Sequence, residues 1–486
     1  MDRLTGLIGI LLILGIAFVV SNNKKKINLR LVLSGLGLQI IIAVLVLKVT
    51  PVRSVFQSLG KGMQYIEGFA REGAAFVYGG IATESEVYNP RVLRSDTVVT
   101  DDGSKHISQY IIQGSAEHES LPVLEFRENS KKADYRYTLV KFDPKTKVLS
   151  SHTPISFVDG VPKTHGDFMQ SGFVFAFNIT ATIILVCILV AILYHIGIMQ
   201  RIVSLIAKAM NFIMRVSGAE ALSNVASAFV GQVEAQVMIR PYLKGMTNSE
   251  LLASMSGSLA CIAGGILVVY TTMGAPAEYL IAASLMAAPG ALVISKIVYP
   301  ETEISQTMGT VKLEVKKEHV NLIDAISHGA SDGFKIATNV IAMLIGFLAL
   351  IALVNYLFGL IYPGLTLDTI FSNLFYPMAW SMGVPTQDVA NVATLLGQKL
   401  TINEFVAFKN LTSQATAVPL VTEKAKMIAS IAICGFANFS SVGMQIGGIG
   451  ALAPERRADL AKLGLRALLC GTLASYLSAT IAGILF

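Results

Sequence analysis

The stretch "NVASAFVGQVEAQVMIRPYL", residues 224–243, decides how this chain folds. It is apolar, yet it carries Gln232 and the carboxylate of Glu234 in its middle and the pair Arg240-Pro241 near its end. A carboxylate at the centre of a bilayer costs at least about 2.5 kcal/mol, so it must face a polar cavity or a partner. We therefore predict a re-entrant hairpin with Glu234 at its tip, which Arg240-Pro241 ends at the cytoplasmic surface.

A second segment, about 373–408, has the same broken and half-polar character. Its "NVATLLGQ" (391–398) matches "NVASAFVGQ" (224–232), and a glutamate follows each motif, Glu234 in the first and Glu404 in the second. Matched segments in two halves of a chain are typical of secondary transporters, which are built from inverted repeats. We predict a second re-entrant hairpin here.

A glycine-rich apolar stretch follows each predicted hairpin. The two stretches are "CIAGGILVVY" (261–270) and "CGFANFSSVGMQIGGIG" (434–450). Irregular backbone at membrane depth is tolerated only inside protein or beside a water-filled cavity. Transporters bind substrate where such broken helices meet near the midplane. The sequence therefore indicates one solute site built from both hairpins and both stretches.

The composition is that of a polytopic membrane protein. The 486 residues are 53% hydrophobic and 14% charged, with a mean hydropathy of +0.61, whereas soluble domains carry about 25% charged residues. We expect an all-α fold of about eight transmembrane helices plus two re-entrant helical hairpins in an inverted repeat, with a small β-rich insertion. The apolar runs are 4–20, 31–48, 172–196, 251–272, 279–298, 336–358, 426–447 and 463–485.

Lysine and arginine gather in alternate loops between these runs, and the positive-inside rule makes those loops cytoplasmic. This orientation places the N-terminus, the C-terminus and the insertion outside a cell inner membrane. The net charge of +6 then reflects membrane topology, and we expect no nucleic-acid partner. The loop cations are Lys24–Lys26, Arg201, Lys208, Arg215, Arg240, Lys244, Lys312, Lys316, Lys317, Arg456 and Arg457.

Residues 81–168 differ in kind from the rest of the chain. They are charged and contain "SQYIIQG", "PVLEFREN", "DYRYTLVKFD" and "PISFVDG", which alternate as strands do. We expect an extracytoplasmic insertion with a structural or partner-docking role. The predicted domains are the N-terminal spans with an interfacial helix (1–80), the insertion (81–168), the first hairpin repeat with scaffold spans (169–358) and the second hairpin repeat with C-terminal spans (359–486).

The polar residues of the hairpin regions suit a neutral, polyhydroxylated solute that contains a ring. A carboxylate such as Glu234 or Glu404 accepts two hydroxyl donors at once, which fits a vicinal diol. Glu220 begins a helix, where negative charge is favoured, and both a structural and a functional role stay open for it. The remaining candidates are the amides of Gln232, Gln236 and Asn438, the hydroxyl of Ser441 and the ring of Phe436.

Sequence signatures of enzymes are absent: there is no Walker loop, no GxSxG and no HExxH. We therefore expect no enzymatic activity and no organic cofactor. Without a nucleotide-binding motif, transport would be driven by an ion gradient.

Several long motifs resemble the concentrative nucleoside transporter family. They include "GAEALSNVASAFVGQVEAQVMIRPYL" (218–243), "TINEFVAF" (401–408) and "CGFANFSSVGMQIGGIGALAPERR" (434–457). The resemblance covers most of the chain outside 81–168. It implies a homotrimer in the bilayer whose protomers move a nucleoside inward with a cation by an elevator-like motion.

The resemblance also implies roles for individual residues. The nucleobase would be bound by Gln232, Val233, Glu234 and Ile266, and the ribose hydroxyls by Glu404, Asn438 and Ser441. Phe436 would line the pocket.

Two departures from the family pattern affect the substrate and the coupling ion. The family's "GQTEAP" is "GQVEAQ" here, so Val233 replaces a hydroxyl near the base. Sodium-coupled members carry an Asn at the position of Ser227 and a Ser or Thr at that of Cys261, and a thiol is a poor ligand for a hard cation. With the carbonyls of Val230 and Ile262, we expect a weak sodium site at best.

We hypothesise that protons are favoured over sodium as the coupling ion. Glu234 or Glu404 would carry the proton, because burial favours the neutral form of a carboxyl group. Two further functions stay open: a membrane receptor or sensor that binds its ligand with residues 81–168, and an uncoupled facilitator.

Overall fold

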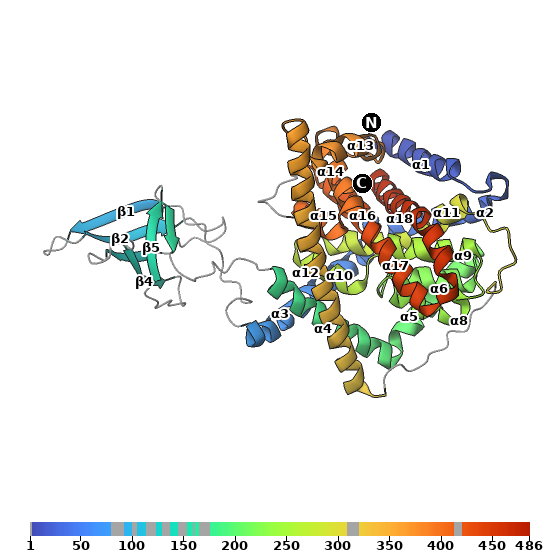
Figure 1. The fold of residues 1–486 in the computed structure, drawn as a ribbon, viewed down its shortest axis with the longest axis horizontal. Coiled ribbons are helices and arrows are strands. Elements are labelled where there is room, and N and C mark those ends of the chain that lie inside the picture. The colour runs from blue at the N-terminus through green and yellow to red at the C-terminus, as the bar shows by residue number, and fades with distance from the viewer. Residues whose placement is uncertain are drawn as a thin grey trace. The chain divides into compact units, whose positions relative to one another are not determined.

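The computed structural model describes residues 2–78, 175–308, 320–412 and 420–486, together with six strands between 92 and 164. The chain divides into two compact units, one formed by Met1–Ala70 with Ile179–Phe486 and the other by Arg71–Asn178. Figure 1 shows the helices that make up most of the larger unit. The expected mainly helical membrane architecture is confirmed in these ranges.

In the part of the chain that the structure describes, five helices precede the first hairpin: α1 (Asp2–Val19), α2 (Leu29–Lys48), α3 (Thr50–Tyr78), α4 (Phe175–Ile196) and α5 (Ile198–Met214). Of these, α1, α2 and α4 are apolar, whereas α3 and α5 are amphipathic. Helices α4 and α5 are separated only by Gly197, whose φ of 82° is easy for glycine, and they are bent by 76° relative to each other. The bend turns the chain away from the direction of α4 before the first hairpin.

The first hairpin consists of α6 (Gly218–Ser227), α7 (Glu234–Val237) and α8 (Arg240–Leu243). A capping box, in which Ser217 and Glu220 each bond the other's backbone N–H, starts α6. Arg240-Pro241 begins α8, the last short helix of the hairpin, because proline lacks only an N–H that the first turn of a helix leaves unpaired. That this pair ends the hairpin at the cytoplasmic surface stays a prediction.

Two of the predicted spans are each divided into two helices, as the glycine-rich motifs predict. The first consists of α9 (Asn248–Ala260) and α10 (Gly264–Thr272), and the second of α16 (Glu423–Ile433) and α17 (Phe439–Leu452). The breaks touch through the backbone, since the N–H of Phe436 donates to Cys261 O at 3.3 Å. Gly435, with a φ of 132°, permits this approach, because a Cβ there would lie 2.5 Å from Ala260 O.

The second hairpin consists of α14 (Val389–Thr401) and α15 (Glu404–Thr412), which pack with α13 (Leu367–Ser381) and α16. Glu404 is the first residue of α15, just as Glu234 is the first residue of α7. The glutamines of the two repeats are not equivalent, however. Gln232 lies in the non-helical turn before α7, whereas Gln398 lies inside α14 and bonds Asp368 and Asn410.

Three long helices complete the larger unit: α11 (Ala277–Val298), α12 (Leu322–Ile361) and α18 (Arg457–Leu485). Helices α11 and α18 are mostly buried and pack against α9 and each other, and α1 lies beside α18 (Figure 1). Where described, every predicted apolar run coincides with a helix or a broken pair. Within the described ranges, four segments are long and apolar enough to cross a membrane: Leu29–Lys48, Asn248–Thr271, Ala277–Val298 and Pro454–Leu485, with the bent α4–α5 pair as a possible fifth.

The smaller unit contains one antiparallel six-stranded sheet in which each strand pairs with the next along the chain, in the order β1 to β6. The four strand-like motifs predicted from sequence lie on β2 to β5, and the structure adds β1 and β6. Predicted insertion residues 81–91 and 165–168 lie outside the described residues. The strands are Val92–Val99, Lys105–Ile112, Val123–Glu128, Tyr137–Asp143, Thr153–Val158 and Val161–Thr164.

Candidate functional site

Glu404 is held at the start of α15 with both of its carboxylate oxygens bonded. It is 7% exposed; Tyr270 OH donates to Oε1 at 3.1 Å and Asn438 Nδ2 donates to Oε2 at 2.8 Å. Asn403, one residue earlier, accepts the N–H of Val406 at 2.9 Å and fixes the turn. The second hairpin thus meets both broken spans, α9–α10 and α16–α17, at one carboxylate.

Asn438 and Ser441 share the first turn of α17. Asn438 is the N-cap, and its Oδ1 accepts the N–H of Ser441 and the hydroxyl of Ser440, each at 2.8 Å. Capping fixes the amide plane, so Nδ2 is aimed at Glu404. The Ser441 hydroxyl is buried without a hydrogen-bond partner in the described part of the chain. A buried polar group of this kind is available to a bound solute.

Three residues near this site are not among those predicted from the sequence: Tyr270, Lys399 and, described below with Gln232, Gln445. Tyr270 stacks on Phe408 with ring centroids 4.3 Å apart while its hydroxyl reaches Glu404. Lys399 is fully buried, with Nζ 3.5 Å from Ala432 O and 5.7 Å from the ring centroid of Tyr476. Tyr270 follows Ile266 by four residues, and that spacing places both on one face of a helix.

Gln232, at the first hairpin, contacts the middle of α17. Its Oε1 accepts from Gln445 Nε2 at 3.5 Å, and its Nε2 lies 3.8 Å from Met444 Sδ. Gln445, the third residue missed from the sequence, also donates to Met255 O at 3.2 Å, and its Oε1 is buried with no partner among the described residues. The amides of Gln232 and Gln445 therefore lie side by side, with hydrogen-bonding capacity that the described residues do not use.

Glu234 and Val233 point in different directions. Glu234 is exposed, makes no hydrogen bond to a described residue, and lies over Gly231, where a Cβ would collide with its carboxylate. Val233 packs against Gly448 of α17, where an added Cβ would lie 2.6 Å from Val233 Cγ2. The side chain that departs from the family pattern is therefore pressed against α17.

Helix α17 connects the two halves of the site. Its N-terminal Asn438 contacts Glu404, and its Gln445 contacts Gln232. Seven residues at 1.5 Å each separate these points by about 10 Å along the helix. Phe436 donates the backbone bond that joins the two broken spans, and Ile266 lies in the first turn of α10; both side chains are partly exposed. No hydrogen bond or ion pair between described residues joins Glu234 to Glu404.

Of the four candidate cation residues, Ser227 lies in a cluster of hydroxyl groups between α6 and α9. Ser227 Oγ donates to Ser223 O and lies 2.8 Å from Ser258 Oγ. Gln236, a candidate for the solute, instead bonds Ser223, Ser254 and Ser258 at 2.6–3.0 Å. Cys261 Sγ is 3.9 Å from Asn224 O and from Ser284 O, and Val230 and Ile262 are buried nearby in sequence.

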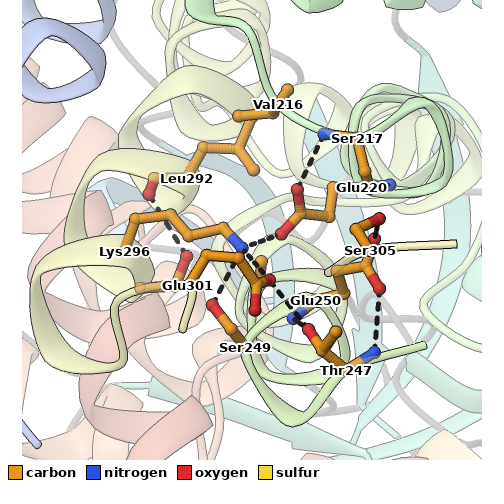
Figure 2. A network of polar contacts seen from close by, with 12 residues as sticks. Val216, Ser217, Glu220, Thr247, Ser249, Glu250, Leu292, Lys296, Glu301 and Ser305 are labelled. Atoms are coloured by element: carbon orange, nitrogen blue, oxygen red, sulfur yellow. Dashed lines mark hydrogen bonds and ion pairs between the residues drawn. The ribbon is translucent and has the colours of Figure 1, made fainter. Parts of the chain in front are cut away.

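Glu220, whose role the sequence left open, belongs to a network at the base of the first hairpin (Figure 2). One oxygen accepts the N–H of Ser217 at 3.0 Å, and the other pairs with Lys296 of α11. Lys296 Nζ also donates to Ser249 Oγ at 2.8 Å and to Glu301 Oε2 at 3.4 Å. Figure 2 shows Lys296 reaching from α11 toward the starts of α6 and α9, so Glu220 links the start of α6 to α11.

Helical hairpins that meet two broken helices are typical of secondary transporters. Three family models match this chain: "Na+ dependent nucleoside transporter N-terminus" over residues 8–81, "Nucleoside recognition" over 176–277 and "Na+ dependent nucleoside transporter C-terminus" over 279–483. The chain belongs to the concentrative nucleoside transporter family, and the resemblance seen in the sequence is confirmed.

Individual relatives match the chain over nearly its full length. The uncharacterized transporter YutK of Bacillus subtilis is 35% identical over 99% of both chains. The nucleoside permease NupC of Helicobacter pylori is 33% identical over 99% of this chain and 98% of its own. A structure of CNTnw in an inward-facing substrate-bound state has a TM-score of 0.78 at 32% identity, covering 100% of this chain and 98% of that one. These relatives confirm that the chain is a membrane transport protein and not an enzyme.

Proposed function

We propose that this chain imports nucleosides together with a cation by elevator-like alternating access. The observation that carries the proposal is the buried Glu404, bonded to Tyr270 and Asn438 beside the Ser441 hydroxyl, which has no partner among the described residues. A ribose offers vicinal hydroxyls, the donors that a fixed carboxylate accepts. The comparison with CNTnw, solved in inward-facing and outward-facing states, supports alternating access.

The ribose would bind at the second hairpin and the nucleobase at the first. Glu404, Asn438 and Ser441 offer two acceptors, an amide and a hydroxyl to the sugar. The base would lie toward Gln232 and Glu234, which donate and accept along a heterocycle edge. The remaining lining would be Val233, Ile266 and Phe436.

For the coupling ion, we propose protons over sodium, although the matching family models are named for sodium. The Ser227 hydroxyl already donates to Ser223 O, and the sulfur of Cys261 is a poor ligand for a hard cation. The carbonyls of Val230 and Ile262 remain as oxygen ligands. Glu234 or Glu404 would then carry the coupled proton.

We also propose that the chain forms about eight spans with two inverted hairpin repeats. Three copies would assemble as a homotrimer in a cell inner membrane. Both termini and the β-rich insertion would lie outside. The domains would be 1–80, 81–168, 169–358 and 359–486, as the sequence predicts.

Uptake of labelled uridine and adenosine into proteoliposomes, with the sodium and proton gradients imposed separately, tests the proposal. Accumulation above equilibrium under an inward proton gradient alone would support it. Accumulation under sodium alone would overturn the ion assignment and leave nucleoside import intact. Failure of both gradients to drive accumulation would overturn coupled import and favour an uncoupled facilitator.

A further inference from the structure

Helix α5 presents a regular stripe of cations and apolar side chains on its outer face. The stripe consists of Arg201, Leu205, Lys208, Phe212 and Arg215, spaced alternately by four and three residues. All five are exposed, Leu205 by 71% and Phe212 by 84%. The 4-3 spacing keeps them on one face of a helix. We call these five residues the basic stripe.

The opposite face of α5 anchors the helix to the protein. Met199, Val203, Ala207, Met210 and Met214 are buried, and α5 packs against α6 and α2. One face of α5 is therefore buried in the core. On the other face, positively charged side chains alternate with bulky apolar ones.

In the described part of the chain, no acidic group balances the basic stripe. Residues 198–215 contain three cations and no aspartate or glutamate. Among the described residues, Arg201, Lys208 and Arg215 take part in no ion pair. Exposed cations that lack carboxylate partners are available to an anionic partner outside the chain.

Arg215 also occupies a backbone position that usually belongs to glycine. It is the C-cap of α5 with φ 54° and ψ 41°, the one non-glycine residue with positive φ in the described ranges. Glycine adopts this left-handed conformation without strain, whereas other residues do not. The chain thus carries a cation at a place where glycine would fit better, which suggests that the charge is used.

We propose that the basic stripe binds the headgroups of anionic phospholipids in the leaflet against which α5 lies. The 76° bend after α4 turns α5 away from the direction of that apolar helix, as expected for a helix lying along a membrane surface. The three cations would contact lipid phosphates while Leu205 and Phe212 enter the acyl boundary. The positive-inside orientation makes this the cytoplasmic leaflet, whose surface is negatively charged.

The chain's single tryptophan makes the proposal testable with full-length protein. Trp380→Phe removes the native signal, and Phe212→Trp places a reporter in the basic stripe. The variant is reconstituted in vesicles that contain equal fractions of brominated phosphatidylglycerol or brominated phosphatidylcholine. We expect stronger quenching by the phosphatidylglycerol. Since each cation near an anionic surface favours binding by about fivefold, removing one should reduce the preference by up to about fivefold.

Two further arms separate charge from simple contact with lipid. The triple variant Arg201→Gln, Lys208→Gln, Arg215→Gln should lose the preference, whereas the matched variant Lys24→Gln, Lys25→Gln, Lys26→Gln, also at exposed lysines, should keep it. Salt at about 1 M, where the Debye length is about 3 Å, should also remove it. Equal quenching by the two lipids would overturn the proposal. An absence of quenching by either would overturn it as well, because the stripe would then face water or another protein chain.

Discussion

The two hairpins place the same residue at the same point and surround it differently. Glu404 and Glu234 each begin the second helix of a hairpin. Glu404 is 7% exposed and has both oxygens bonded, whereas Glu234 is exposed and bonds no described residue. A group fixed before binding loses little freedom when a ligand arrives. The second hairpin therefore holds its carboxylate in a fixed position, whereas the carboxylate of the first hairpin is not held by a described residue.

The largest effect is expected from Glu404→Gln, which keeps the shape of the side chain and removes its charge. Each hydrogen bond to a charged group contributes about 1.5–3 kcal/mol, so losing two charge-assisted bonds to ribose should lower nucleoside affinity by about 100-fold or more. Binding to purified protein and uptake into proteoliposomes both measure this. Glu423→Gln, at an exposed glutamate of α16, is the matched control and should change neither. Unchanged uptake by Glu404→Gln would remove Glu404 from the site.

The second prediction is that the base of the first hairpin affects stability and not nucleoside affinity. Lys296 and Glu220 form an ion pair with side chains 6% and 2% exposed. Removing one partner of a buried pair costs about 3–5 kcal/mol, so Lys296→Met should lower the thermal stability strongly. The nucleoside affinity of the protein that remains folded should change little, because the pair does not face the site.

The control for this loss is Lys335→Met, since the ion pair between Lys335 and Asp332 is solvent-exposed and such pairs contribute little. The double variant Lys296→Met, Glu220→Gln should recover part of the stability. If Lys296→Met unfolds at the wild-type temperature, the network does not anchor the hairpin.

The difference between local and distant contacts explains what could be predicted from the sequence. The broken spans, the hairpins and the helix start at Glu220 follow from glycines, charges and capping patterns within a few residues. The bond from Tyr270 to Glu404 joins residues 134 positions apart, and no local pattern contains it. Gln236 looked like a ligand for solute because it is polar, but its serine partners come from α6 and α9. Lys296 lies inside an apolar run, so no local pattern indicates its ion pair.

The third prediction, of a smaller effect, concerns how firmly Glu404 is held at the second hairpin. Tyr270→Phe keeps the ring stack on Phe408 and removes only the hydroxyl that holds Glu404 Oε1. Losing one hydrogen bond to a charged group should cost about 1.5 kcal/mol, or about tenfold in affinity. The matched control is Tyr476→Phe, because the Tyr476 hydroxyl is buried without a partner in the described ranges. An affinity of Tyr270→Phe equal to that of the wild type would mean that Tyr270 acts through packing alone.

The smallest effect is expected at the first hairpin, where base preference should be adjustable without loss of transport. Val233→Thr keeps the branched shape that packs on Gly448 and adds the hydroxyl found in the family pattern. One new hydrogen bond to a nucleobase contributes about 1 kcal/mol, so the ratio of uridine to adenosine uptake should shift by up to about fivefold. Val237→Thr, three residues beyond Glu234, makes the same chemical change away from the turn and should leave the ratio unchanged. Competition between the two nucleosides in one assay gives the ratio directly. A ratio equal to wild type would mean that Val233 faces only α17, and that Gln232 and Glu234 alone distinguish the bases.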